Sequence, residues 1–237
     1  MNCRALGTLA IVLLPALGCS RASEELPMSP AVSLTRAERA AGWRALFDGS
    51  SLAGWHSFRS TGTSGWSVRD GAITRVGEGP DLVTAEQFAN FEFAADWKIA
   101  PEGNSGIIYR VADSGGETYV TGPEMQVLDD ARHPDGKSRL TAAGSVFAIY
   151  PAPAGVVKPA GEWNTVLLVV NGNHVEHWLN GVQMVEYELG SADWAKRLAA
   201  SKFRSTPGYG RAPTGRIALQ NHGDTVAFRN IRIRVLP

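Results

Sequence analysis

Apolar and polar residues alternate with a period of two along most of the chain after residue 42. In the segment 91–99 every odd-numbered residue is apolar, from Phe91 to Ile99, whereas Glu92, Asp96 and Lys98 lie on the opposite face. This alternation is typical of a strand with one buried face. Similar patterns predict further strands at 66–69, 72–76, 164–170, 174–179, 182–189, 215–222 and 226–235.

Turn residues separate these segments in the way that antiparallel strands require. Asp70-Gly71 and Asn180-Gly181 each join two alternating runs, and both dipeptides tolerate the positive φ angles of hairpin turns. A helical pattern follows Ser191 and extends to Lys202, and Ser191 is a suitable cap. About ten strands, one short helix and no alternation of strands with helices predict an all-β fold. We expect a concanavalin-like jelly-roll sandwich of two antiparallel sheets.

The first residues have the features of an export signal. Arg4 precedes a short apolar run, and the segment ends in Gly18-Cys19, which resembles a bacterial lipobox. We therefore predict a signal peptide at 1–18, a lipidated N-terminus and tether at 19–42, and one domain at 43–237. The alternative is plain secretion, in which Cys19 is an incidental residue.

Charge and cysteine content exclude several classes of protein. Lys and Arg number 23, as do Asp and Glu, so no overall charge attracts the chain to nucleic acid or to an anionic membrane. The two cysteines are Cys3 and Cys19, and cleavage removes the first. The mature domain can therefore form no internal disulfide and no thiolate metal site. We expect an exported protein of the cell envelope or periplasm, attached to the membrane through its lipid alone.

A series of short motifs is spread in order over about 190 residues. It comprises Leu46-Phe47-Asp48-Gly49, Gly103-Asn104-Ser105-Gly106, Glu124-Met125-Gln126, Glu162-Trp163-Asn164, His177-Trp178-Leu179-Asn180, Ser201-Lys202-Phe203 and Gln220-Asn221-His222-Gly223. With these motifs the sequence resembles the 3-keto-disaccharide hydrolase family from residue 43 to residue 236. The resemblance implies a jelly-roll fold and action on glycosides whose sugar is oxidised to a ketone at C3. It also implies a separate glycoside 3-oxidoreductase that produces the ketone.

The chemistry of such a substrate defines what a site must supply. A ketone at C3 acidifies the proton on C2, because the resulting carbanion is delocalised as an enolate. A general base removes that proton, the enolate expels the aglycone from C1, and hydration of the enone completes a net hydrolysis. The site therefore needs a base near C2, a donor or cation at the C3 oxygen, and an acid near the glycosidic oxygen.

Three expected strands carry polar faces that a curved sheet would gather into one groove. These faces hold Glu124 and Gln126, then Gln220 and His222, and, on the strand that begins at residue 106, Arg110. The alternative is that they are ordinary solvated faces of an antiparallel sheet. With the resemblance we favour a shared groove. The predicted substrate-binding residues are Asn104, Arg110, Gln126, Asp129, Lys137, Gln220 and His222.

The loop 129–137 concentrates ionisable residues, and loops on rigid scaffolds often carry function. Histidine is the residue type best suited to proton transfer near neutral pH, so we predict that His133 is the base at C2, with Asp135 or Asp129 fixing its tautomer. The alternative is a polar turn, since His-Pro and Asp-Gly dipeptides form turns.

Other side chains are assigned to the remaining steps. Lys137 or Arg110 is expected to stabilise the enolate oxygen, and Glu124 is expected to act as the acid or to orient the ketone. Asp129, Asp130, His133 and Asp135 also offer ligands to a divalent ion. No Cys or His spacing typical of a metal site accompanies them, so we expect no metal cofactor, with a divalent ion as the alternative.

Two other functions compete with this interpretation. Concanavalin-like sandwiches also serve as non-catalytic carbohydrate-binding modules, and the fold alone does not separate binding from catalysis. A conventional β-glucan hydrolase would place carboxylates at alternating positions of one strand. Glu124 is instead followed two residues later by the amide Gln126, so this function ranks last.

Overall fold

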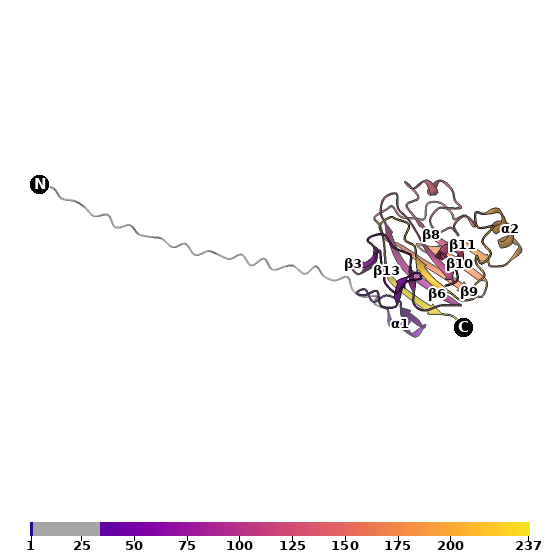
Figure 1. The fold of residues 1–237 in the computed structure, drawn as a ribbon, viewed down its shortest axis with the longest axis horizontal. Helices are drawn as coiled ribbons and strands as arrows, with labels where there is room; N and C mark the ends of the chain where they lie inside the picture. Colours follow the sequence, from indigo (N-terminus) through magenta and orange to yellow (C-terminus); the bar gives the residue numbers. More distant parts are fainter. Residues whose placement is uncertain (2–33) are drawn as a thin grey trace.

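The computed structural model describes residue 1 and residues 34–237, which form two antiparallel β-sheets packed face to face (Figure 1). The larger sheet has eight strands: β1 (Trp43–Ala45), β3 (Trp66–Arg69), β4 (Ala72–Arg75), β6 (Phe91–Ile99), β9 (Asn164–Asn171), β10 (His174–Leu179), β11 (Val182–Glu188) and β13 (Val226–Val235). The smaller sheet has five: β2 (Trp55–Ser57), β5 (Leu82–Thr84), β7 (Asn104–Val111), β8 (Glu124–Leu128) and β12 (Arg216–Leu219).

The helical segments lie outside the two sheets. They are α1 (Arg36–Ala40), α2 (Ala192–Ala200) and the 3₁₀ turns η1 (Thr118–Val120) and η2 (Pro134–Lys137). No helix of the described residues is long and apolar enough to cross a membrane. Ser191 caps α2 by accepting a hydrogen bond from the Trp194 amide at 3.1 Å, as its sequence position predicts. The helix ends at Ala200, so Lys202 lies in the loop that follows.

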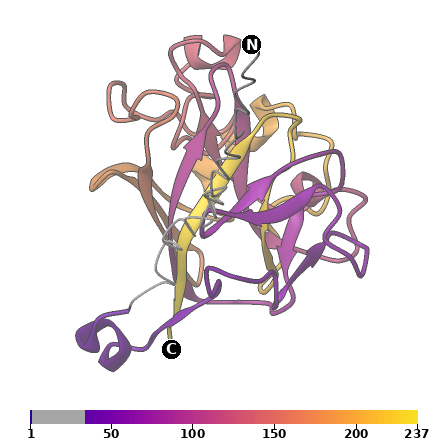
Figure 2. The same ribbon diagram turned by 90° about the vertical axis from the view of Figure 1, so that its left-hand side faces the viewer.

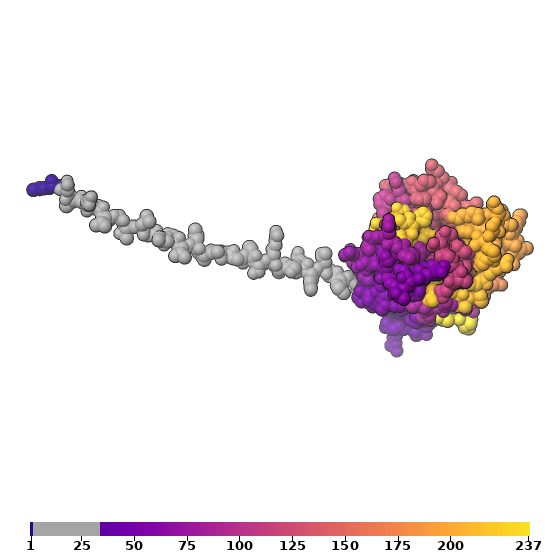
Figure 3. Space-filling model, viewed as in Figure 1, coloured from indigo at the N-terminus to yellow at the C-terminus, as the bar shows by residue number. Residues whose placement is uncertain are grey.

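The strand order brings distant parts of the chain together. The larger sheet runs β11-β10-β9-β6-β13-β4-β3, with β1 added to β13, and the smaller sheet runs β2-β5-β12-β7-β8. The C-terminal β13 therefore lies between β6 and β4, and in Figure 2 its yellow ribbon crosses the violet and magenta strands. The space-filling view likewise shows yellow atoms of the C-terminal part bordering violet atoms of the N-terminal part (Figure 3).

The core lies between the sheets and is built by the alternation seen in the sequence. On β6 the odd-numbered residues are buried, and Trp97 is 1% exposed. Met125 and Val127 of β8 and Ile217 and Leu219 of β12 belong to the same apolar cluster. Each such side chain contributes about 1.5–3 kcal/mol by leaving water. The expected all-β jelly-roll sandwich is confirmed, although the described residues form 13 strands where the sequence predicted about ten. The short strands β1, β2 and β5 have only three residues each, too few to show alternation.

Two parts of the predicted organisation have different outcomes. The signal peptide at 1–18 and the lipidated Cys19 fall, apart from residue 1, outside the described residues. Within the tether predicted at 19–42, the described residues form the short helix α1. Thr35 and Glu38 cap this helix reciprocally, through the Thr35 hydroxyl and the Glu38 carboxylate.

The strand β7 departs from strict alternation at Arg110. This residue has a φ of 55°, and the pairing of β12 with β7 shifts register in the same region. Ile108 and Val111 therefore lie in one small apolar cluster, although they are three positions apart. Arg110 was expected on a polar face that borders the groove, but the left-handed backbone turns its side chain elsewhere. Its guanidinium donates to the carbonyl of Gly172, in the turn between β9 and β10.

Candidate active site

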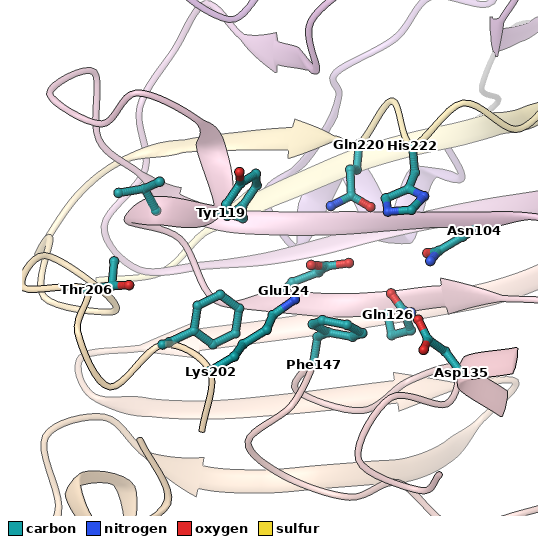
Figure 4. A pocket seen from close by; sticks show the side chains of 12 residues that line it. Asn104, Tyr119, Glu124, Gln126, Asp135, Phe147, Lys202, Thr206, Gln220 and His222 are labelled. Carbon is teal, nitrogen blue, oxygen red and sulfur yellow. The ribbon is translucent and has the colours of Figure 1, made fainter. Parts of the chain in front are cut away.

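A cavity of about 620 Å³ lies on the face of the smaller sheet that points away from the core (Figure 4). Its floor is formed by β7, β8 and the chain just after β12. Its walls come from η1, from Phe147 and from the loop after α2. The lining residues are Asn104, Tyr119, Val120, Glu124, Gln126, Asp135, Phe147, Lys202, Phe203, Thr206, Gln220 and His222.

Glu124 lies in the floor of this cavity and is 4% exposed. It is the first residue of β8 and pairs with Ile108 of β7, while Gly106 of β7 lies beside its carboxylate. A Cβ atom at Gly106 would be 2.3 Å from Glu124 Oε1. Only glycine therefore leaves room for the carboxylate in this position.

Burial raises the pKa of Glu124 to about 8. The nearby charge of Lys202 and a side-chain hydrogen bond with Gln220 act in the opposite direction, and the carboxylates of Asp81 and Asp135 add to the increase. Near neutral pH this group is mostly protonated, and a small rise in pH makes it a carboxylate. A carboxyl group with this pKa in a cavity is suited to proton transfer.

Two glutamine side chains border the cavity with unused hydrogen-bonding atoms. Neither Oε1 nor Nε2 of Gln126 has a partner within the described part of the chain, and the same holds for Oε1 of Gln220. Leaving a buried polar group without a partner costs about 1–3 kcal/mol. Both residues are fixed through their backbones, since the Gln126 amide donates to Ser145 and the Gln220 amide to Gly106. The two side chains are therefore placed to bond a polar ligand.

Lys202 enters the cavity from the loop after α2. Its amino group lies 4.1 Å from the centre of the Phe147 ring and 5.0 Å from that of Phe203. These cation–π contacts hold the chain of Lys202 across the cavity wall. Figure 4 shows its amino end beside Glu124, in agreement with the effect of its charge on that carboxyl.

Two of the three predicted polar faces share one groove, whereas the third, which carries Arg110, does not border it. Glu124 and Gln126 of β8 line the same cavity as Gln220 and His222. Asn104 and Asp135, both expected at the site, also line it. His222 is exposed at the rim, whereas Gln126 is 1% exposed in the floor.

Four other predicted site residues do not line this cavity. His133 caps η2, and its Nδ1 accepts a hydrogen bond from the Asp135 amide at 3.1 Å. Lys137 ends η2 and is exposed. Asp129 is buried and accepts hydrogen bonds from the amides of Glu102 and Ala131, and Arg110 lines a different cavity. The turn at Pro134 and the left-handed backbone at Arg110 determine where the side chains of His133 and Arg110 point. The alternation of apolar and polar residues in the sequence does not reveal either feature. The roles assigned to the four residues stay predictions.

The possible metal ligands of the loop 129–137 also point apart. Asp129 bonds the amides just described, whereas Asp130 accepts a hydrogen bond from the Ala143 amide at 2.8 Å. Among residues 34–237 no three His, Cys, Asp or Glu side chains gather in a way that would hold a metal ion. These aspartates and His133 therefore do not form one ligand set.

Sequence reasoning missed the wall of the cavity. Tyr119, Phe147, Lys202 and Thr206 come from loops and 3₁₀ turns, where no periodicity indicates which way a side chain points. The signal for Lys202 was present, because Ser201-Lys202-Phe203 is one of the motifs that carry the resemblance. Because the predicted helix extended to Lys202, the sequence did not indicate that this residue lies in a loop that borders the cavity.

Comparisons with known proteins agree with this fold and identify the family. Residues 42–234 match the family model of the 3-keto-alpha-glucoside-1,2-lyase-like domain. The chain is 33% identical to a 3-keto-disaccharide hydrolase of Bacteroides thetaiotaomicron, over 91% of this chain and 89% of that relative.

Solved structures show the same architecture. A crystal structure from Parabacteroides distasonis, provisionally named a glycosyl hydrolase, is 35% identical and superposes with a TM-score of 0.82 over 87% of this chain and all of that one. A second protein of the same organism and the same provisional name is 24% identical, with a TM-score of 0.66 over 82% of this chain and 99% of that one, and shares the fold. The chain therefore belongs to the 3-keto-alpha-glucoside-1,2-lyase-like family.

Proposed function

We propose that this protein hydrolyses the glycosidic bond of 3-keto-glycosides, including disaccharides, in the cavity that contains Glu124. The family and the named relative support the substrate class. The observation that carries the assignment to this cavity is the buried carboxyl group of Glu124, whose pKa of about 8 suits proton transfer near neutral pH.

In the first step the carboxylate of Glu124 removes the proton on C2 of the sugar. The C2–H bond breaks, and its electron pair forms the C2–C3 double bond of an enolate, with the negative charge on the C3 oxygen. The ammonium group of Lys202 and the amide of Gln126 border the same cavity and supply the positive charge and the donor that this oxygen needs.

In the second step the enolate restores the C3 ketone and expels the aglycone. The C1–O bond breaks toward the aglycone oxygen, which takes the proton that Glu124 now carries. Water then adds to C1 of the enone, and C2 is protonated. The net change is the addition of one water molecule across the glycosidic bond, so no redox cofactor is consumed.

The proposed substrate must be produced by another enzyme. A separate glycoside 3-oxidoreductase must introduce the ketone, because the proposed reaction consumes it only as an activating group. We further propose that the protein acts in the cell envelope, anchored to the membrane by lipid on Cys19 alone, and that nucleic acid is not a partner. Cys19→Ser should release the protein into the soluble fraction, and a soluble wild-type protein that begins at another residue would contradict the anchor.

The test of the function is product analysis with paired substrates. The purified protein is incubated with a 3-keto-disaccharide and with the same disaccharide without the ketone. We expect cleavage of the keto sugar alone. Cleavage of the plain sugar would identify a conventional glycosidase, and binding of either sugar without cleavage would identify a carbohydrate-binding module. A chelator added to a parallel reaction tests the expectation that no metal ion is needed.

A further inference from the structure

A second cavity, of about 530 Å³, is lined by α2, whereas the loop after α2 lines the Glu124 cavity. Trp194, Ala195 and Leu198 of α2 form one wall, and the chain from Gly210 to Pro213 forms another. The floor holds Arg110, whose left-handed backbone turns it into this space. The two cavities share no lining residue in this region, because Trp194 and Leu198 line the second cavity and Lys202 and Phe203 line the first.

Arg110 is a buried cation that has no counter-ion among residues 34–237. It is 5% exposed, its Nε has no hydrogen-bond partner in the described residues, and one guanidinium nitrogen donates to the Gly172 carbonyl. Burying an unpaired charge is costly, and a single carbonyl uses only one of the five N–H donors of arginine. The contact with Gly172 therefore leaves most of the guanidinium available.

Comparison with other arginines shows that this arrangement is unusual in the molecule. The Nε atoms of Arg229 and Arg232 are also buried without a hydrogen bond, but each lies near a carboxylate, Asp96 at 3.5 Å and Glu38 at 3.4 Å. Arg110 forms no ion pair with any carboxylate of residues 34–237. The charged or ionisable groups that act on it are the phenols of two buried tyrosines.

The other charged residue of the cavity lining is also an arginine. Arg211 is exposed at the edge of the cavity, and neither Asp nor Glu lines it. Two cations and no carboxylate favour an anion, and a guanidinium binds the oxygens of a carboxylate or a phosphate with paired hydrogen bonds. We infer that this second cavity binds a small oxyanion, such as the carboxylate of a sugar acid or a phosphate group, between Arg110 and Arg211. This site is independent of the function proposed for the Glu124 cavity.

Calorimetry with defined probes tests this site. Glucuronate, inorganic phosphate and glucose are titrated separately into the full protein at constant ionic strength. We expect glucuronate or phosphate to bind and glucose not to bind. The anion that binds more tightly distinguishes an organic acid from a phosphoryl group. Absence of binding by both anions would overturn the inference.

Variants assign the binding to this cavity. Arg211→Glu reverses an exposed charge and should raise the Kd of the bound anion by about tenfold or more. Arg211→Gln only removes the charge and should raise the Kd by less. Arg69→Glu makes the same change of net charge on the exposed end of β3 and is the matched control, with no change expected. Arg110→Lys keeps the charge but loses the paired donors, and should also weaken binding. Equal weakening by Arg69→Glu and Arg211→Glu would overturn the site.

Discussion

Glu124 and His177 are two buried ionisable residues. Burial shifts the pKa of each toward the value that favours its neutral form, but the hydrogen bonds around the two side chains differ. Burial lowers the pKa of His177 to about 4, so that it is neutral at pH 7. Its Nδ1 contacts the Gly144 carbonyl at 3.1 Å, and its Nε2 contacts the Tyr109 hydroxyl at 3.0 Å. Both ring nitrogens therefore have hydrogen-bond partners, and His177 lines neither of the two cavities described above, which agrees with a structural role in the core.

Glu124 is equally buried, but it borders a cavity and its neighbours are incompletely bonded. Gln126 has two unpartnered polar atoms, and Gln220 has one. A shifted pKa is thus common to both residues, and the difference lies in whether the surrounding polar groups are already satisfied. Satisfied groups indicate a structural role, whereas unsatisfied groups beside a cavity indicate a binding or catalytic role.

The largest expected effect is the loss of activity in Glu124→Gln. This change keeps the size of the side chain and removes the base, so kcat/KM on a 3-keto-glycoside should fall by about 10²–10⁴-fold. Thermal unfolding should stay close to that of the wild type. Glu176→Gln, the same change on β10 away from both cavities, is the control and should keep full activity. Equal activity of the two variants would remove Glu124 from the mechanism.

Gly106→Ala should reduce activity without removing any functional group. The added Cβ would meet Glu124 Oε1 at 2.3 Å, so the carboxylate must move. We expect a loss of about tenfold to a hundredfold, since small displacements of reacting groups have effects of this order. Gly62→Ala has no atom within 4 Å of its new Cβ and should behave as wild type. Unchanged rates in Gly106→Ala would mean that the carboxylate position is not critical.

His177→Ala should reduce stability and leave activity nearly unchanged, whereas Glu124→Gln should do the reverse. His177→Ala leaves a cavity in the core and removes one of the two hydrogen-bond partners of the Tyr109 hydroxyl, at a cost of about 2–4 kcal/mol of unfolding free energy. Denaturant unfolding measures this loss. The activity of the folded fraction should stay within a few-fold of wild type, and a selective loss of activity at unchanged stability would contradict a structural role.

His133→Ala has the smallest expected effect and separates the two candidate bases. Because His133 lies outside the cavity, its replacement should change kcat/KM by less than about threefold if Glu124 is the base. A loss of 10²–10⁴-fold, the value typical of a missing general base, would return that role to His133 as the sequence predicted.

The sequence was most informative where its period was regular. Alternation in β6, β8 and β12 predicted the core face of each strand, and it correctly gathered Glu124, Gln126 and Gln220 on one groove. It failed at Arg110, because one left-handed residue reverses the faces that follow it. The alternation was also uninformative in loops. There His133 was predicted as the base for its chemistry alone, and Lys202 was not predicted as a site residue.

The pH dependence of C2 proton exchange in D₂O tests the central claim most directly, because it reports the base before the aglycone leaves. A base acts when deprotonated, and burial holds the pKa of Glu124 at about 8, so exchange should rise with pH and level off above pH 8. Lys202→Met removes a charge that favours the carboxylate and should move this rise to higher pH. Exchange that levels off near pH 6.5, the usual pKa of an imidazole, and is unaffected by Lys202→Met would contradict the account.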